Sequence, residues 1–249
     1  MNQLYKSEPI FKKQSKNGLL MLHGFTATPY EFLDFSKEFE QDNYSLSIPL
    51  LRGHGKSVED LKNCHWYQWF EDAKNALFEL RKICDHIFVI GQSMGGTLAL
   101  HLASHYQVEG VILLAPGLFL KQKGSSFLPA ISPFKTYFDK KDGPDIKNEI
   151  SRAKAVSYDK TPVKGVIELK RLFSHVKKDL PEVYAPTLLF HSQDDHVIDY
   201  KSSEYIYDHI SSKNKRILTL TNSYHVLSLD NEKNIIKKET KKFIARILK

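Results

Sequence analysis

Residues 86–105 of the chain read HIFVIGQSMGGTLALHLASH. The β-branched and aromatic run at 87–90 has the length of a buried strand, and the leucines within 98–102 follow at spacing compatible with a helix. We therefore predict a sharp strand-to-helix turn at 91–95, which reads GQSMG. A serine on such a turn stands clear of its own backbone, and glycines beside it avoid Cβ collisions with the neighbouring strand or helix. Ser93 is therefore placed as an attacking hydroxyl requires.

Apolar strands and amphipathic helices alternate along most of the chain. Buried strands are expected at 19–22, 44–51, 110–115, 187–191 and 216–220, with a short edge strand around residues 10 and 11. Helices are expected at 30–39, 66–84, 202–210 and 234–248, besides the one after Ser93. Continuous apolar strands separated by helices predict an α/β fold with a mainly parallel sheet covered on both faces. In such a sheet the chemistry lies at the carboxyl ends of the strands.

The alternation stops in one segment, residues 118–185. It contains prolines at positions 129, 133, 144, 162 and 181, and helical patterns at 145–156 and 163–175. We interpret it as an inserted helical subdomain that divides a core domain made of residues 1–117 and 186–249. Residues 121–182 hold 14 lysines and arginines against 8 acidic residues, which is most of the net charge of +7. Because no recognition motif or regular array of aromatic residues accompanies this charge, we expect a solvated basic face and no nucleic-acid partner.

Composition places the chain among ordinary globular proteins. Its 249 residues are 41% hydrophobic and 26% charged, enough for one large core or one domain with an insertion. No apolar run is long enough to span a bilayer, and residues 1–18 lack the features of a signal peptide, so we expect a cytoplasmic protein without stable membrane insertion. The two cysteines, Cys64 and Cys84, have neither metal nor redox spacing and are read as free, small apolar residues. The pattern does not decide between a monomer and a homodimer.

Polar groups follow the last two predicted strands. The strand at 187–191 runs into SQDD at 192–195, and the strand at 216–220 is followed by NSYH at 222–225. Ser93, then an acid, then His225 is the order in which α/β-hydrolases assemble a catalytic triad.

The chain resembles bacterial serine carboxylesterases and monoacylglycerol lipases of the α/β-hydrolase superfamily. The resemblance covers essentially the whole chain, through LHGFT at 22–26, RGHG at 52–55, GQSMGG at 91–96, QDDHV at 193–197 and SYHV at 223–226. It implies the α/β-hydrolase fold, with the inserted segment acting as a cap between the sixth and seventh strands of the sheet.

The triad roles follow from chemical need. A serine hydroxyl is a weak nucleophile at neutral pH, so His225 must take its proton during attack and later return a proton to the leaving alcohol. An aspartate must hold the imidazole in the right tautomer. The family pattern places this acid three residues before a small apolar residue, and Val197 therefore favours Asp194. Asp195 and His196 are then expected to be loop residues.

The tetrahedral intermediate of ester hydrolysis also needs hydrogen-bond donors. We expect the backbone N–H groups of Met94 and Phe25 to form this oxyanion hole, each contributing about 3 kcal/mol to the transition state. The resemblance assigns His54 a turn-fixing role.

No cofactor or metal is expected. The chain has neither a dinucleotide-binding fingerprint nor a P-loop. His101 and His105 have the spacing of metal ligands on a helix, but no glutamate motif or third ligand accompanies them in the sequence. We therefore expect both to be core or solvent-facing side chains.

These patterns predict hydrolysis of short- to medium-chain carboxylic esters, or of monoacylglycerols, through an acyl-serine intermediate. The alternatives are an acyl thioesterase and a non-catalytic ligand receptor on the same scaffold. The physiological ester depends on the inserted segment, whose apolar residues either form its own small core or line an acyl-binding tunnel. Those residues are Phe119, Leu120, Phe127, Leu128, Ile131, Phe134, Tyr137 and Phe138.

Overall fold

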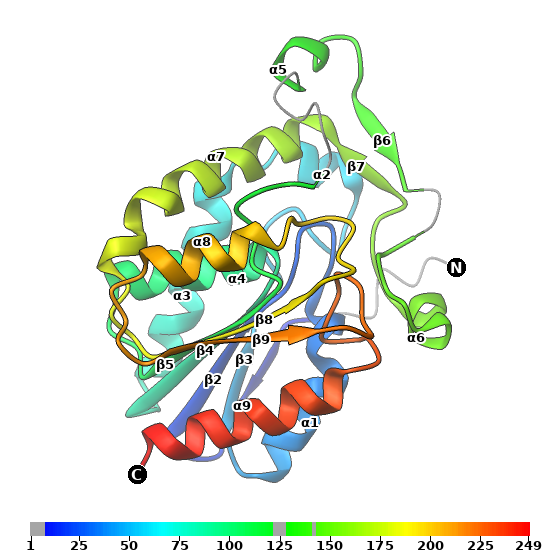
Figure 1. The fold of residues 1–249 in the computed structure, drawn as a ribbon. Coiled ribbons are helices and arrows are strands. Elements are labelled where there is room, and N and C mark those ends of the chain that lie inside the picture. Colours follow the sequence, from blue (N-terminus) through cyan, green and yellow to red (C-terminus); the bar gives the residue numbers. More distant parts are fainter. Residues whose placement is uncertain (1–7, 122–127, 141–142) are drawn as a thin grey trace.

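The computed structural model describes residues 8–121, 128–140 and 143–249. A seven-stranded sheet with the order β1-β3-β2-β4-β5-β8-β9 forms the centre of this part of the chain (Figure 1). Only the pairing of β1 with β3 is antiparallel, and the other neighbouring strands are parallel. The strands are β1 (Ile10–Lys12), β2 (Asn17–Leu22), β3 (Ser45–Ile48), β4 (His86–Gln92), β5 (Gly110–Leu114), β8 (Thr187–Ser192) and β9 (Lys215–Leu220).

Helices cover both faces of the sheet (Figure 1). One face carries α1 (Leu33–Gln41), which follows the 3-10 turn η2 (Pro29–Phe32), and α9 (Lys233–Ile247). The other carries α3 (Trp66–Arg81), α4 (Met94–His105), α7 (Val163–Asp179) and α8 (Lys201–His209). The prediction of an α/β fold with a mainly parallel, doubly covered sheet is confirmed.

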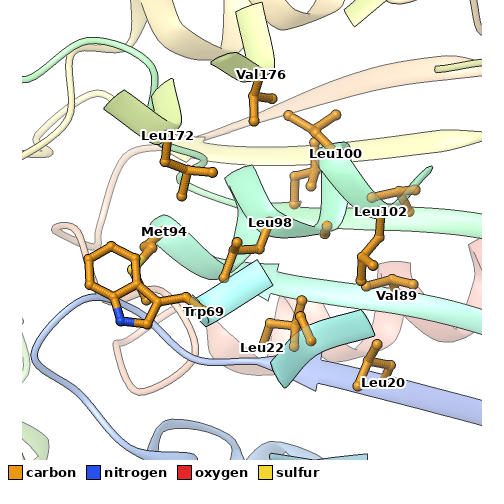
Figure 2. Close-up of a cluster of buried hydrophobic side chains, with 14 of the residues drawn as sticks. Leu20, Leu22, Trp69, Val89, Met94, Leu98, Leu100, Leu102, Leu172 and Val176 are labelled. Atoms are coloured by element: carbon orange, nitrogen blue, oxygen red, sulfur yellow. The ribbon is translucent and has the colours of Figure 1, made fainter. Parts of the chain in front are cut away.

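Two apolar clusters, one on each face of the sheet, hold the helices in place. There are two because successive residues of a strand point to opposite faces. In β2, Leu19 and Met21 enter the cluster under α1 and α9, whereas Leu20 and Leu22 enter the cluster under α3 and α4. Figure 2 shows the second cluster, where Trp69 from α3 and Leu98 from α4 lie over the strands. These side chains are fully buried, which fixes the start of α4 against the carboxyl ends of the central strands.

The inserted segment begins after β5 and contains short elements that the sequence patterns only partly predicted. They are α5 (Leu128–Ile131), the antiparallel pair β6 (Tyr137–Asp139) and β7 (Lys160–Pro162), and α6 (Glu149–Lys154). Outside the insertion, the short helix α2 (Val58–Lys62) was also not predicted. Its N-cap is Ser57, whose side chain forms a capping box with Asp60. The insertion follows the fifth strand of the main sheet rather than the sixth, because within the described residues a single strand precedes β2.

Helix α7 belongs to the layer over the sheet although it lies within the expected insertion. Leu172 and Val176 from α7 pack beside Leu98 and Leu100 of α4 in the same buried cluster (Figure 2). The short turn η4 (Leu180–Glu182) then leads to β8. The division at residues 118 and 185 stays a proposal, and the packing of α7 favours a cap that ends at Pro162. Among the described residues, no helix is both long enough and apolar enough to cross a membrane.

Candidate active site

The turn between β4 and α4 has the sharp geometry predicted for residues 91–95. Ser93 has φ 54° and ψ −115°, a strained backbone for a residue with a side chain. A Cβ on Gly95 would lie 1.9 Å from the carbonyl oxygen of Leu22, and one on Gly91 would lie 2.2 Å from that of Gly95. Only glycine fits at these two positions, so the glycines allow β4, α4 and the end of β2 to meet at the serine.

The side chains of Ser93, His225 and Asp195 form one hydrogen-bonded chain. Nε2 of His225 is 2.9 Å from the Ser93 hydroxyl, and Nδ1 is 2.7 Å from Oδ2 of Asp195. An ionised carboxylate only accepts, so Nδ1 carries the imidazole proton and Nε2 accepts from the serine hydroxyl. This is the tautomer in which a histidine can take a proton from serine.

The expectation that Asp194 is the triad acid is wrong in this geometry. The Asp194 side chain is 52% exposed and lies 3.6 Å from the ammonium group of Lys147. Asp195 is buried, and its Oδ1 accepts the backbone N–H groups of Val197 and Ile198, both at 2.8 Å. The chain turns after β8, and this turn directs Asp195 inward and Asp194 toward solvent. Spacing from Val197 does not reveal that direction.

Opposing effects set the charge states of the pair. Burial alone would raise the pKa of Asp195, but the attraction of His225 and contacts from His191 and His225 outweigh it, so the pKa lies well below its usual range. Burial alone would lower the pKa of His225, but the charge and hydrogen bond of Asp195 raise it above its ordinary value, with smaller contributions from Asp145 and Glu31. Asp195 therefore stays ionised and stabilises a protonated His225.

His191 is a second histidine next to the Asp195 carboxylate. Its Nε2 lies 3.2 Å from Oδ2 of Asp195, and its Nδ1 lies 2.7 Å from the Ser203 hydroxyl. Both the histidine and the aspartate are almost completely buried. The His191 ring therefore lies beside the carboxylate, whose hydrogen bonds come from His225 and from the N–H groups of Val197 and Ile198.

The loop that carries His225 is held by both the core and the insertion. The side-chain amide of Gln92 donates to the His225 carbonyl at 3.0 Å. From the insertion, the Asp145 carbonyl accepts the N–H groups of His225 and Val226, both at 3.1 Å. The buried carboxylate of Asp230 accepts the N–H group of Tyr224 on this loop. The position of His225 is therefore set by three separate parts of the chain.

The two expected oxyanion donors flank the serine. Met94 is the first residue of α4, where the helix dipole favours negative charge. The loop after β2 carries Phe25, and a Cβ on the preceding Gly24 would lie 3.6 Å from Cβ of Ser93. Neither the Phe25 nor the Met94 N–H donates to a protein acceptor among the hydrogen bonds of the described residues. Both groups are thus free to bind an oxyanion.

Glu31 and His23 fix the loop beside Phe25. Oε2 of Glu31 accepts the Gly24 N–H at 2.7 Å, and burial raises the Glu31 pKa to about 7. Nε2 of His23 accepts the Leu51 N–H at 3.1 Å, and Nδ1 is 2.9 Å from the Gly24 carbonyl. Burial lowers the His23 pKa to about 4, so this histidine is neutral at pH 7. Its two ring nitrogens connect the loop after β2 to the backbone at Leu51.

A pocket of about 840 Å³ lies over these groups and is roofed by the insertion. Of the apolar residues singled out in the insertion, four line it: Leu120, Leu128, Ile131 and Phe138. Phe119 instead packs against the main core, Tyr137 hydrogen-bonds to Glu59, and Phe134 is 92% exposed. Phe127 lies outside the described residues. Some of these apolar residues therefore line the pocket, as one alternative expected, whereas others do not.

The ammonium group of Lys140 lies on a polar side of this pocket. The Lys140 ammonium lies 2.5 Å from the Thr26 hydroxyl and 3.0 Å from the Ser157 hydroxyl, and all three residues line the pocket. Burial lowers the Lys140 pKa to about 8, against the opposing attraction of Glu31. The pocket therefore has a polar side next to the loop of Phe25.

His54 and His196 lie outside the triad. Nδ1 of His54 contacts the carbonyl oxygens of Leu51 and Arg52 at 3.2 and 3.1 Å, a turn-fixing position as expected. The exposed His196 ring pairs with Asp145 at 2.9 Å, so it joins the loop after β8 to the insertion. Sequence patterns did not identify Glu31, Lys140 or His191. Lys140 contacts Thr26, which is distant in the chain. Glu31 and His191 contact Gly24 and Asp195 across loops whose backbone path residue spacing does not specify.

Comparisons with known proteins agree with this fold. The family model described as serine aminopeptidase, S33 matches residues 13–233. The chain belongs to this family of α/β-hydrolases. It is 32% identical over 246 residues to a thermostable monoacylglycerol lipase from Bacillus sp. (strain H-257), covering 96% of this chain and 95% of that protein. The carboxylesterase of Bacillus subtilis (strain 168) is 23% identical, covering 96% and 97% of the two chains.

A solved structure supports the same assignment. A metagenome-derived lipolytic enzyme superposes with a TM-score of 0.92 at 30% identity, covering 96% of this chain and 98% of that one. The family resemblance and the α/β-hydrolase fold expected from the motifs are confirmed.

Proposed function

We propose that the protein is a serine carboxylesterase of the monoacylglycerol lipase type, with Ser93 as nucleophile, His225 as base and Asp195 as the supporting acid. The observation that carries the proposal is the hydrogen-bonded chain from Ser93 through His225 to Asp195 at the floor of the pocket under the insertion. The names of two relatives, monoacylglycerol lipase and carboxylesterase, describe enzymes that hydrolyse carboxylic ester bonds and thus support the proposal.

The reaction begins when the Ser93 oxygen attacks the ester carbonyl. His225 takes the hydroxyl proton through Nε2, and the resulting imidazolium is stabilised by the buried charge of Asp195. The imidazolium then gives its proton to the leaving alcohol, which departs as the acyl-serine forms. A water molecule then takes the place of the alcohol, gives a proton to Nε2 of His225 and attacks the acyl-serine carbonyl. The imidazolium returns this proton to the Ser93 oxygen as the carboxylic acid leaves.

Charge develops on the carbonyl oxygen in both tetrahedral intermediates. We propose that the N–H groups of Phe25 and Met94 receive it, each supplying about 3 kcal/mol. Their freedom from protein acceptors supports this role. Because both are backbone groups held by packed elements, they need no reorganisation at the moment of attack.

The pocket supports an acyl chain of short to medium length. Its volume of about 840 Å³ lies within the range that encloses a small lipid-like ligand, and its apolar residues suit a hydrocarbon chain. Lys140, Thr26 and Ser157 supply polar contacts near the reaction centre, as the hydroxyls of a glycerol ester require. The ester is the only partner that the proposal includes, and it leaves the oligomeric state open.

A cytoplasmic location completes the proposal. The two cysteines, Cys64 and Cys84, are free and buried, which agrees with a reducing compartment.

Hydrolysis of p-nitrophenyl esters of graded chain length and of 1-monoacylglycerols tests the proposal. We expect turnover by the wild type, loss of turnover in Ser93→Ala, and retention in Ser104→Ala, a half-buried serine farther along α4. A fluorophosphonate should label the wild type but not Ser93→Ala. Absence of turnover and labelling in the wild type would refute the proposal, and so would cleavage confined to amino-acid p-nitroanilides.

A further inference from the structure

A second cluster of ligand-type side chains lies at the far end of α4. His101 and His105 are four residues apart on α4, and Asp179 reaches them from the last turn of α7. One potential ligand atom from each residue falls in a set whose members all lie within 4.8 Å of one another. Packing of α4 against α7 thus supplies the third ligand that the sequence pattern lacked.

Two of the three groups lack a hydrogen-bond partner. Nδ1 of His101 lies 2.8 Å from Oδ2 of Asp179, yet the pair does not have hydrogen-bond geometry, and both atoms are buried without any other partner in the described structure. The His101 ring is 5% exposed. Buried polar atoms of this kind are rare, because each costs the free energy of its lost hydration.

The tautomer of His105 prepares it as a ligand. Its Nδ1 is 3.0 Å from the His101 carbonyl oxygen, which can only accept, so Nδ1 carries the proton. Nε2 of a neutral His105 therefore presents a lone pair. A ligating histidine typically donates its other N–H to a carbonyl or carboxylate in this way. Because the His105 ring is exposed, a small rotation can bring its nitrogen to the distance that a shared ion requires.

Aromatic side chains partly shield the site from solvent. Phe70 packs against the His101 ring with centroids 4.2 Å apart, and Trp66 lies 5.8 Å away. His175 lies four residues before Asp179 on α7, with its ring 6.3 Å from that of His101. It can supply a fourth ligand, or water can.

We propose that His101, His105 and Asp179 form a binding site for a divalent transition-metal ion, with zinc as the best match. Two imidazoles, one carboxylate and a fourth ligand are a ligand set that zinc accepts in tetrahedral geometry. The ion would join α4 to α7 at the end of α4 opposite Ser93. Its role is structural, since the ester chemistry does not involve these residues.

Binding of Zn²⁺ to the tag-free full chain, measured by calorimetry, tests the site. We expect one saturable site in the wild type, and binding weakened by about tenfold or more in His105→Ala and in Asp179→Asn. His209→Ala is the matched control, because His209 is exposed and its Nδ1 contacts the carbonyl of the residue four positions earlier, but it has no clustered ligand. Binding should also persist in His225→Ala, which excludes the triad histidine as the ligand.

Two further readouts make the outcome decisive. Co²⁺ should give the visible absorption of a tetrahedral site in the wild type and lose it in His105→Ala. A hundredfold excess of Zn²⁺ over its Kd should raise the wild-type Tm by roughly 5–10 °C and the Tm of Asp179→Asn by much less. Absence of saturable binding, or equal binding in His105→Ala and the wild type, would overturn the proposal. None of these measurements depends on esterase activity.

Discussion

The carboxylate of Asp195 lies 2.7 Å from Nδ1 of His225, and its other oxygen receives two backbone N–H groups. Such a carboxylate cannot turn away from the imidazole without losing those bonds. The neighbouring Asp194 faces solvent and Lys147.

Replacement of these two aspartates should therefore have very different effects. In Asp195→Asn the amide loses the charge that stabilises the imidazolium and no longer selects the correct tautomer, so kcat should fall by about 10⁴-fold. Asp194→Asn, at the adjacent position, should stay within about twofold of the wild type, because an exposed ion pair contributes little. The kcat of both variants with one p-nitrophenyl ester gives the comparison, and the reverse order would assign the acid to Asp194.

The raised pKa of His225 should be visible in the pH profile. Catalysis needs neutral His225, so kcat/KM should fall as the pH drops through its pKa, and the midpoint should lie above the unperturbed value of about 6.5. Asp145 contributes part of the upward shift, so Asp145→Asn should move the midpoint toward lower pH. A wild-type midpoint at or below pH 6.5 would contradict the electrostatics described for this pair.

Glu31 should act by positioning the loop of Phe25. In Glu31→Ala the Gly24 N–H loses its acceptor, and we expect kcat to fall by about tenfold to a hundredfold with little change in KM. Glu31→Gln keeps an acceptor oxygen and should retain most of the activity. Steady-state kinetics of the two variants separates these outcomes, since equal losses in both would indicate that the charge, rather than the hydrogen bond, matters.

Gly95 should be intolerant of any side chain. The Cβ of Gly95→Ala would lie 1.9 Å from the Leu22 carbonyl oxygen, so the strand and helix must separate, and we expect a loss of about 3 kcal/mol or more in unfolding free energy. Ala103→Gly, on the same helix, should cost only about 1 kcal/mol. Urea unfolding measures both, and a stable Gly95→Ala would show that the turn can relax.

Lys140 should favour esters whose alcohol is polar. In Lys140→Met the pocket loses the ammonium group beside Thr26. We therefore expect kcat/KM to fall more for a monoacylglycerol than for the p-nitrophenyl ester of the same acyl chain. The ratio of the two values is the measurement, with Lys135→Met as the control because Lys135 also lines the pocket but is exposed. An unchanged ratio would remove Lys140 from alcohol recognition.

The fold and most of the site follow from local sequence patterns. Apolar runs and glycine-bounded turns predicted every strand of the main sheet among the described residues, and the GQSMG sequence predicted the sharp strand-to-helix turn that carries Ser93. These features are readable because each depends on neighbours in the chain. The short pair β6 and β7 was missed because three-residue strands carry too few residues to show a period.

The predictions failed for the orientation of side chains on a turn and for contacts between residues far apart in the chain. Whether Asp194 or Asp195 faces His225 depends on the backbone of one turn, which residue spacing does not specify. The contact between Asp179 and His101 depends on the packing of α7 against α4, two helices that lie more than 50 residues apart in the chain, and local spacing does not predict such packing.

Strands β5 and β8 are hydrogen-bonded neighbours, with Val111 opposite Thr187 and Leu114 opposite Phe190. The chain thus leaves the sheet for the insertion and returns on the neighbouring strand. Among the described residues of the insertion, none pairs with a strand of the main sheet. The roof can therefore change length and composition as an interchangeable module while the sheet keeps its register. In a family built this way, the range of esters can diverge rapidly while the machinery for cleaving them is inherited intact.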